Sequence, residues 1–317
     1  MKIIMTGATS FIGAATVREL LRRGHTVTAI VRPASSKLQT ILDGNEEALL
    51  TGRLLVTEND LSEPEKLLEK VTMPQDVFCH FGWGGSGSAA RTDQALQEKN
   101  LTTSLETIRT AKALGCRRFL FSGSQAEYGM HRDTITEETV CEPKSLYGEA
   151  KLAMRIQGEE LGRQLGLQYI HTRIFSAYGP GDHPWTLVES CLDAFLNERE
   201  MSLGACTQNW NFLYIDDLAR GMAALCETEE EKFQGLTNPV FNFGGTETKM
   251  LKAFVEEIHE LCGGRGVSRY NTRGENAEGL INLMPSIEKM KAVTGWMPEI
   301  DFKTGISRMI ALRKRTI

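Results

Sequence analysis

The chain has 317 residues, of which 41% are hydrophobic and 24% are charged, and its formal net charge at pH 7 is −5. This length allows one large domain or two smaller units with a substantial buried core. The acidic balance supplies no positive field for nucleic acid or an anionic membrane, so we expect neither as a partner. The apolar start, Met1 to Met5, is too short for a secretion signal or a membrane span.

Cysteine and histidine are scattered along the chain, with seven of the former and six of the latter. The cysteines form no CxxC pair, and several lie within apolar stretches, which is typical of reduced thiols in a cytoplasmic protein. The histidines form no HxxxH pair and no cluster with cysteine. We therefore expect no metal site.

The first half alternates short strand-like runs with helical stretches, which predicts an α/β fold with a doubly wound parallel sheet. The expected strands are Lys2–Met5, Thr26–Val31, Leu54–Val56, Val77–Phe81, Arg118–Ser122 and Gln168–Thr172. The expected helices are Ile12–Arg23, Pro64–Lys70, Thr92–Leu114 and Leu146–Leu165. Gly24, Gly115 and Gly166 follow three of these helices, where a left-handed residue commonly ends a helix.

The pattern changes after Ala177, where Tyr178 to Pro184 has the composition of a loop. Strand-like runs return at Asn211–Ile215 and Val240–Phe243. We expect a smaller lobe that closes over the carboxyl edge of the sheet, where ligands bind in this architecture. The predicted dinucleotide-binding domain comprises residues 1–176 and 206–245, and the predicted substrate-binding lobe comprises residues 177–205 and 246–317.

The first expected strand leads directly into a glycine-bearing turn, Thr6-Gly7-Ala8-Thr9-Ser10-Phe11-Ile12-Gly13. Gly7 permits the tight turn and Gly13 lets the helix pack closely on the sheet. The helix N-terminus then presents N–H groups and a favourable dipole to a pyrophosphate. Many strand-to-helix turns favour glycine, so the turn alone is weak evidence. Its place after the first strand favours a dinucleotide site.

The end of the second expected strand bears on cofactor choice. An NAD site usually places Asp or Glu there, whereas an NADP site favours Arg. Here the strand ends at Val31-Arg32, and Lys37 follows within the next loop. Arg32 and Lys37 could receive a phosphate, which favours NADP. NAD remains the alternative, because a solvated basic loop has the same composition.

Tyr147 and Lys151 are four residues apart on an expected helix, so their side chains project from one face. A phenol with a pKa near ~10 is a poor base at neutral pH, but a nearby ammonium and an oxidised nicotinamide favour the phenolate. Ser124, after an expected strand, would hold a substrate oxygen against Tyr147. A YxxxK pair alone is weak evidence and serine is common in turns. The strand–turn–helix order strengthens the hypothesis.

In the order of its motifs the chain resembles the extended short-chain dehydrogenase/reductase family of the NAD-dependent epimerase/dehydratase type. The resemblance points to the nucleotide-sugar 4-ketoreductase and epimerase branch. The matching segments are Thr6–Gly13, Asn59–Leu61, His80–Gly84, Asn100, Phe121–Gly129, Pro143–Lys151, Arg173–Gly181, Phe212–Leu218 and Asn242–Gly245. The resemblance implies three catalytic residues, Ser124, Tyr147 and Lys151. It implies cofactor contacts from Gly7, Ser10, Phe11, Ile12, Gly13, Arg32, Lys37, Asp60, Leu61, Gly82, Trp83, Asn100, Ser122, Tyr147, Lys151 and Ile174. It implies substrate contacts from Gln125, Ser176, His183, Trp210 and Arg273.

Several residues depart from the family pattern. Gln125 and Ala126 stand where dehydratases of the family carry an Asp-Glu pair, so a 4,6-dehydratase is not expected. Ser176 replaces the usual substrate-loop asparagine, and Trp210 replaces an arginine that often contacts the diphosphate. Arg273 resembles the other diphosphate-binding arginine, with a solvated surface charge as the alternative.

The resemblance implies hydride transfer at C4 of a nucleotide-linked sugar. In the favoured interpretation, NADPH reduces a 4-keto-6-deoxy sugar and Tyr147 donates the proton. The alternative is a 4-epimerase with tightly bound NAD, and a remote alternative is a non-catalytic dinucleotide-sensing protein. The family commonly forms homodimers by packing helix pairs, here Thr92–Leu114 and Leu146–Leu165, although the sheet could instead cover their apolar faces.

Overall fold

A seven-stranded sheet forms the centre of the larger lobe in this computed structural model, which describes residues 1–85, 88–236, 238–274 and 281–315. All neighbouring strands are parallel, in the order β10-β6-β5-β4-β1-β2-β3. These strands are β1 (Lys2–Thr6), β2 (Thr26–Val31), β3 (Leu54–Glu58), β4 (Val77–His80), β5 (Arg118–Ser124), β6 (Gln168–Ile174) and β10 (Val240–Phe243). The predicted doubly wound fold is confirmed.

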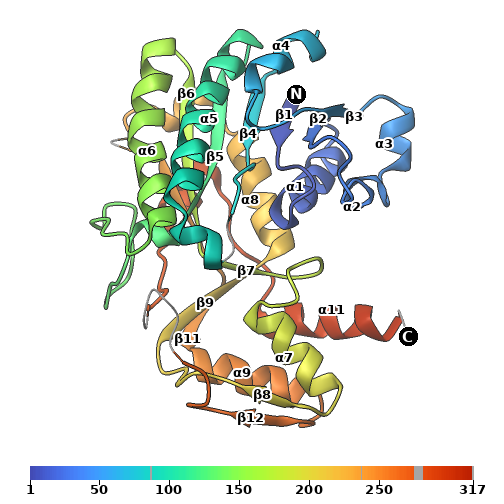
Figure 1. Cartoon of the computed structure of the whole chain (residues 1–317), viewed down its shortest axis with the longest axis vertical. Helices are drawn as coiled ribbons and strands as arrows, with labels where there is room; N and C mark the ends of the chain where they lie inside the picture. The colour runs from blue at the N-terminus through green and yellow to red at the C-terminus, as the bar shows by residue number, and fades with distance from the viewer. Residues whose placement is uncertain (86–87, 237, 275–280, 316–317) are drawn as a thin grey trace.

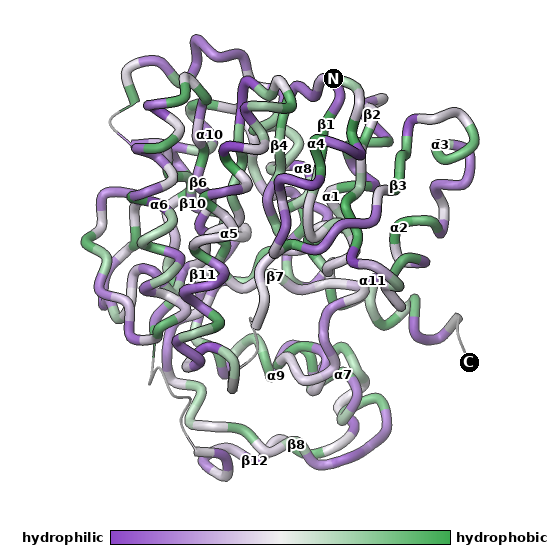
Figure 2. The backbone as a smooth tube through the Cα atoms, turned by 45° about the horizontal axis from the view of Figure 1, so that its top comes forward, coloured by the Kyte–Doolittle hydropathy of each residue, from purple (hydrophilic) through white to green (hydrophobic). Residues whose placement is uncertain are grey.

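Helices cover both faces of this sheet (Figure 1). α1 (Phe11–Arg22) packs beside α8 (Ile215–Glu227), and α5 (Gln94–Ala113) packs beside α6 (Leu146–Leu165). Ile3 and Met5 of β1 belong to the core cluster that contains α1 and α8, whereas Ile4 belongs to the cluster that contains α5 and α6. Because both of their faces are buried, the inner strands of the sheet are nearly continuous apolar runs, as Figure 2 shows for β4.

The remaining helices are short or belong to the smaller lobe. They are α2 (Gln39–Leu42), α3 (Glu46–Leu50), α4 (Leu67–Lys70), α7 (Leu187–Leu196), α9 (Leu251–Leu261), α10 (Glu288–Thr294) and α11 (Phe302–Arg315). The 3₁₀ turns are η1 (Pro64–Lys66), η2 (Ser88–Thr92), η3 (Gln125–Glu127) and η4 (Glu230–Phe233). The helix expected over Pro64–Lys70 is therefore split into η1 and α4. The helix expected from Thr92 begins at Gln94, because the Asp93 side chain caps it by accepting the Leu96 N–H.

Two small sheets lie outside the large one. β7 (Ser176–Tyr178), β9 (Asn209–Tyr214) and β11 (Thr248–Met250) form the first, in the order β11-β9-β7. β8 (Glu200–Ser202) and β12 (Val267–Arg269) form the second. Each strand of the first sheet lies next in the chain to an element of the larger lobe: β7 follows β6, β9 leads into α8, and β11 follows β10. The predicted domain boundaries stay a prediction.

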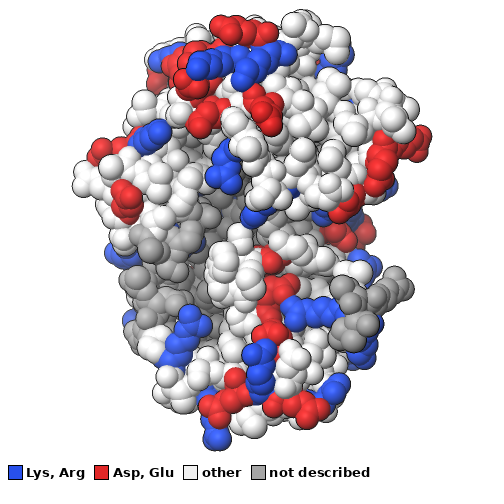
Figure 3. All heavy atoms as spheres, turned by 45° about the vertical axis from the view of Figure 1, so that its right-hand side comes forward, with Lys and Arg blue, Asp and Glu red and all other residues white. Residues whose placement is uncertain are grey.

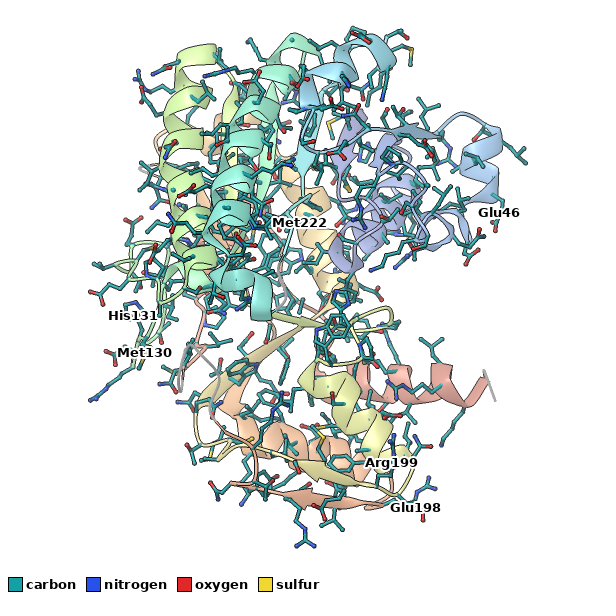
Figure 4. The ribbon with its side chains drawn as sticks, viewed as in Figure 1. Glu46, Met130, His131, Glu198, Arg199 and Met222 are labelled. Atoms are coloured by element: carbon teal, nitrogen blue, oxygen red, sulfur yellow. The ribbon has the colours of Figure 1, made fainter. Side chains whose placement is uncertain are left out.

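Figure 4 labels side chains of both the interior and the surface. Met222 on α8 is fully buried in the interior of the larger lobe, while Glu198 and Arg199 lie at the far end of the smaller lobe (Figure 4). Acidic and basic side chains are interspersed over the face drawn in Figure 3. All seven cysteines carry free thiols.

Within the described ranges, no helix is both long enough and apolar enough to span a bilayer.

Arg118, at the start of β5, closes the C-terminal end of α8. The side chain is fully buried. Its guanidinium donates to the carbonyl oxygens of Leu225 at 2.6 Å, Cys226 at 2.8 Å and Thr228 at 2.8 Å. Carbonyls in the last turn of a helix have no partner within the helix, so this arginine satisfies them from the neighbouring strand. Burial lowers the pKa of Arg118 to about 10.

Candidate active site

The strand order reverses between β1 and β4, and the turn after β1 fits closely into the crevice at that point. Gly7 has a φ of +69°, and a Cβ there would lie 2.6 Å from the Phe81 carbonyl carbon and 2.7 Å from the Gly82 nitrogen. A Cβ on Gly13 would lie 2.1 Å from the Gly7 oxygen. Only glycine allows the turn to meet β4 on one side and α1 on the other. Ligands of doubly wound sheets bind at such a reversal point.

The first turn of α1 offers an anion site beside these glycines. Ser10 is the N-cap, and its hydroxyl accepts the Gly13 N–H at 3.1 Å. Phe11 and Ile12 open the helix, where N–H groups have no helical partner and the dipole favours negative charge. The predicted pyrophosphate-binding residues Gly7, Ser10, Phe11, Ile12 and Gly13 therefore lie together. Their arrangement fits a dinucleotide.

The ends of β2 and β3 lie side by side, since the Asn59 N–H donates to the Val31 carbonyl at 2.9 Å. Arg32 and Lys37, which follow β2, are exposed, and the strand carries no acidic side chain at its end. Asp60, which follows β3, is also exposed. Cationic and acidic side chains thus both lie at the ends of β2 and β3.

Leu61, in the loop after β3, packs against the segment that follows β4. A Cβ on Gly82 would lie 2.7 Å from Leu61 Cδ1, so the leucine fills the space that the glycine leaves. The carboxylate of Asp60 is turned toward its own loop: it accepts the Ser62 hydroxyl at 2.7 Å and the Ser62 N–H at 2.8 Å. These hydrogen bonds lower the pKa of Asp60. Asp60, Leu61 and Gly82 are thus neighbours.

α5 fixes the segment that follows β4. The Asn100 side chain accepts the Gly84 N–H at 3.1 Å and donates to the Gly84 carbonyl at 2.7 Å. One turn earlier, Gln97 accepts the indole N–H of Trp83 at 2.9 Å. These contacts hold the Trp83 indole at the carboxyl end of the sheet, beside the face of α6 that carries Tyr147.

Lys151 lies at the centre of the predicted catalytic group. Its ammonium donates to the Ser122 carbonyl at 2.6 Å and lies 4.0 Å from the ring centroid of Trp83 and 4.5 Å from that of Phe121. The Tyr147 ring centroid is 5.7 Å from the same nitrogen. Both Tyr147 and Lys151 are buried, and burial lowers the pKa of Lys151 to about 7. Tyr147 and Lys151 share one face of α6, as predicted.

The first turn of α6 packs against η3, the turn that Ser124 caps. A Cβ on Gly148 would lie 2.5 Å from the Ala126 oxygen, so the two turns are in close contact. The Ser124 hydroxyl accepts the Ala126 N–H at 3.2 Å and is nearly buried. This packing brings the Ser124 turn beside the Tyr147 turn. Ile174 lies level with Ser124 on the neighbouring strand.

Arg91, in η2, was not expected from the sequence. Its guanidinium carbon lies 4.7 Å from the ring centroid of Tyr147, and the Trp83 ring lies 6.4 Å from the same ring and nearly perpendicular to it. An arginine in a polar loop carries no sequence pattern that distinguishes it from a solvated charge. The Tyr147 ring therefore contacts both a cation and an aromatic ring.

Three of the predicted substrate residues lie just after β5, just after β6 and on β9. Gln125 follows Ser124 directly, and Ser176 begins β7, two residues beyond Ile174. Trp210 lies on β9 and packs against the cluster that contains Tyr128 and Phe175. Among the described residues, the Gln125 Oε1 and Trp210 Nε1 atoms are buried without a hydrogen-bond partner. Buried polar atoms of this kind are satisfied by a bound molecule or water.

His183 and Arg273 lie farther along the smaller lobe. The His183 ring stacks on Trp185, with centroids 4.4 Å apart, in the loop between β7 and α7. Arg273 is exposed in the segment after β12, and its backbone N–H donates to the Leu203 carbonyl at 3.1 Å. No described contact joins either residue to Tyr147, Lys151 or Ser124.

A sequence profile identifies the relationship behind this arrangement. The profile of the NAD-dependent epimerase/dehydratase family matches residues 3–244, which include the glycine-bearing turn and the group around Lys151. The chain belongs to this family. Its architecture is that of the extended short-chain dehydrogenase/reductases, as the resemblance implied.

Relatives of the family share nearly the whole chain. An uncharacterized UDP-glucose epimerase of Bacillus subtilis is 27% identical, over 98% of this chain and 97% of its own. The UDP-glucose 4-epimerase of Corynebacterium glutamicum is 26% identical, over 94% of this chain and 91% of its own. Among solved structures, the Bacillus cereus UDP-glucuronic acid 4-epimerase with UDP-glucuronic acid and NAD superposes with a TM-score of 0.81 at 22% identity, covering 100% of both chains. That likeness shows the fold.

A buried charged group lies behind Ser124, and the sequence analysis missed it. Glu127, His171 and Arg173 are all buried, and the Glu127 carboxylate contacts the other two side chains. The acidic residue is visible within the family motif Phe121–Gly129. Its partners on β6 are more than forty residues away, and no local pattern connects them to it.

Proposed function

We propose that this chain catalyses hydride transfer at C4 of a nucleotide-linked sugar, with Tyr147 as the acid or base. The observation that carries the proposal is the buried group on α6 and β5. In it the Lys151 ammonium lies beside the Tyr147 ring, and Ser124 caps the turn on which that helix packs. A dinucleotide bound at the β1–α1 turn would supply the hydride acceptor or donor.

Each of the three catalytic residues has a separate task. The Lys151 cation favours the phenolate of Tyr147, which can then take a proton from a C4 hydroxyl or, as a phenol, give one to a C4 alkoxide. Ser124 steadies the same oxygen by a hydrogen bond. Because Tyr147 and Lys151 are 8% and 3% exposed, the proton moves in a site that bulk water hardly reaches.

The favoured reaction is reduction of a 4-keto-6-deoxy sugar by NADPH. Support comes from the exposed Arg32 and Lys37 after β2 and from the absence of an acidic side chain at that strand end. Gln125 and Ala126, in place of an acidic pair, leave the turn without the groups for elimination of water. A reductase does not eliminate water and therefore does not need this acidic pair.

The second candidate is a 4-epimerase that retains NAD. Two named relatives are UDP-glucose epimerases, and solved neighbours include a UDP-glucuronic acid 4-epimerase bound to NAD. In that reaction Tyr147 removes the C4 hydroxyl proton, hydride passes to the cofactor, and hydride returns to the other face of the keto sugar. The same three residues would serve.

The other assignments belong to this proposal. The unpaired buried atoms of Gln125 and Trp210 support their place in the substrate site, with Ser176, His183 and Arg273 completing it. The predicted cofactor residues keep their roles, and the larger lobe holds the dinucleotide while the smaller lobe holds the sugar nucleotide. We also propose a cytoplasmic homodimer that packs through α5 and α6.

The test begins with purified protein, a denatured sample of which is analysed for bound nucleotide. An empty protein that prefers NADPH and oxidises it with 4-keto sugars supports the reductase, whereas retained NAD with no net cofactor turnover supports the epimerase. Tyr147→Phe should lower turnover at least about a hundredfold while dinucleotide binding is unchanged. Tyr214→Phe is the matched control and should behave as the unmodified chain. Unchanged turnover in Tyr147→Phe would refute the catalytic role of the phenol.

A further inference from the structure

The carboxylate of Glu127 holds the backbone of the Ser124 turn from behind. One carboxylate oxygen accepts the Ser124 N–H at 2.8 Å, and the Ser124 hydroxyl in turn accepts an N–H from the same turn, so the two residues form a capping box. Glu127 is fully buried and therefore cannot reach a substrate. Its effect on Ser124 passes through the backbone.

Two side chains of β6 balance the charge of Glu127. The Arg173 Nε donates to Glu127 Oε2 at 2.7 Å, and the His171 Nε2 lies 2.9 Å from Oε1. Gly123 makes room for this contact, because a Cβ there would lie 2.3 Å from His171 Nε2 and 2.6 Å from Glu127 Oε1. Burial alone would raise the pKa of Glu127, but His171 and Arg173 lower it to about 2. The carboxylate is therefore charged at every working pH.

The group extends to the helix that carries the catalytic residues. The Tyr169 hydroxyl lies 3.0 Å from His171 Nδ1 and donates to the Met154 carbonyl of α6 at 3.1 Å. On the other side, the His171 ring stacks on Phe121 at 5.3 Å, and the Lys151 ammonium lies over that same Phe121 ring. Glu127 and Lys151 are thus linked through two stacked rings, those of His171 and Phe121.

Burial lowers the pKa of Lys151, and the charge that opposes this effect is that of Glu127. The Lys151 site is nearly dry, so a charge close to it is weakly screened. In the described part of the chain, the titratable groups that interact with Glu127, Lys151 or Tyr147 are His80, Arg91, Cys141, Tyr169, His171 and Arg173. Tyr128 and Glu137 lie beside Arg173.

We propose that Glu127 is a positioning residue for the catalytic group: it fixes the Ser124 turn and supplies the buried negative charge that keeps Lys151 an ammonium. The catalytic meaning of this inference rests on the proposed function. The electrostatic link between Glu127 and Lys151 does not, and it can be measured without a substrate.

The deciding variant is Glu127→Gln, which keeps an oxygen that can accept the Ser124 N–H and removes only the charge. Lysine labelled with ¹³C at Cε reports the protonation of Lys151 by NMR, and the signal is assigned by its absence in Lys151→Met. We expect the Lys151 midpoint in Glu127→Gln to move to lower pH by at least about half a unit. Glu149→Gln, an exposed carboxylate on the same helix, is the matched control and should leave the midpoint in place.

Glu127→Gln leaves Arg173 buried without its partner and could unfold the chain. The double variant Glu127→Gln/Arg173→Met carries neither charge and should show a smaller shift in the same direction, because the cation that balances Glu127 is removed with it. A midpoint within about 0.2 units of the unmodified chain in whichever of the two variants folds would overturn the proposal. If the chain turns over a nucleotide sugar, the alkaline fall of kcat/KM should move with the midpoint. A chain without turnover would refute the proposed function and leave the NMR result to decide the role of Glu127.

Discussion

Replacing Arg118 with methionine should destabilise the larger lobe without touching the active site. The change keeps most of the side-chain volume and removes three hydrogen bonds from a charged donor to the carbonyls of Leu225, Cys226 and Thr228. A fourth hydrogen bond, to the Gln168 side chain, is also lost, but that amide is only half-buried and can bond water instead. Each such bond contributes roughly 1.5 kcal/mol at the lower end of its range, or about 4.5 kcal/mol for three. Methionine avoids the burial cost of the guanidinium, which offsets about 1–2 kcal/mol. We expect a net loss of about 3 kcal/mol.

The measurement is urea unfolding followed by circular dichroism, with the free energy of unfolding taken from the midpoint and slope. Arg109→Met is the matched control, since Arg109 is 53% exposed and makes one surface ion pair with Glu106. That substitution should cost less than about 0.5 kcal/mol. A difference of less than about 1 kcal/mol between the two variants would refute the view that Arg118 supports the end of α8.

Three further outcomes follow from individual side chains. Arg32→Glu should weaken NADP(H) binding at least about tenfold more than NAD(H) binding in a fluorescence titration, and equal losses would contradict a phosphate contact. We expect kcat/KM to fall as pH rises through the Lys151 pKa of about 7. Trp83→Leu removes a ring that stabilises the ammonium by about 2 kcal/mol, so the fall should start roughly 1.5 units lower, and Trp83→Phe should shift it less. An unmoved pH profile would exclude the ring from this role. The charge of Glu127 stabilises the fold above about pH 4.5, and this stabilisation is lost as pH falls toward 2. The free energy of unfolding of Glu127→Gln should therefore depend less steeply on pH in this range than that of the unmodified chain. Parallel curves would contradict the low pKa.

The sheet and the first turn were predictable because their signals are local. Each central strand is a short apolar run, and glycines mark the turn after β1 and the ends of three helices. Gly24, Gly115 and Gly166 have positive φ angles, as predicted. The pair Tyr147 and Lys151 was predictable for the same reason, since four residues of one helix determine their common face.

The parts that sequence reasoning missed depend on distant partners or on very short elements. α2 and α3 are about one turn long, and single turns carry no recognisable apolar stripe. Strands of three residues, such as β8 and β12, are too short to show an alternation. Arg118 and Glu127 look like ordinary surface charges in the sequence, because the groups that bury and neutralise them lie far along the chain.

The connections of β7, β9 and β11 to the larger lobe limit both how the two lobes can move and how they can be exchanged between relatives. One residue separates β6 from β7, none separates β9 from α8, and four separate β10 from β11. A rotation of the smaller lobe would have to bend three backbones at once, which favours a preset cleft over a swinging flap. The smaller lobe is also not a contiguous module that a single deletion removes. A chimaera that borrows the sugar specificity of a relative would need a splice point at each of these junctions and on both sides of α10, which packs on β10.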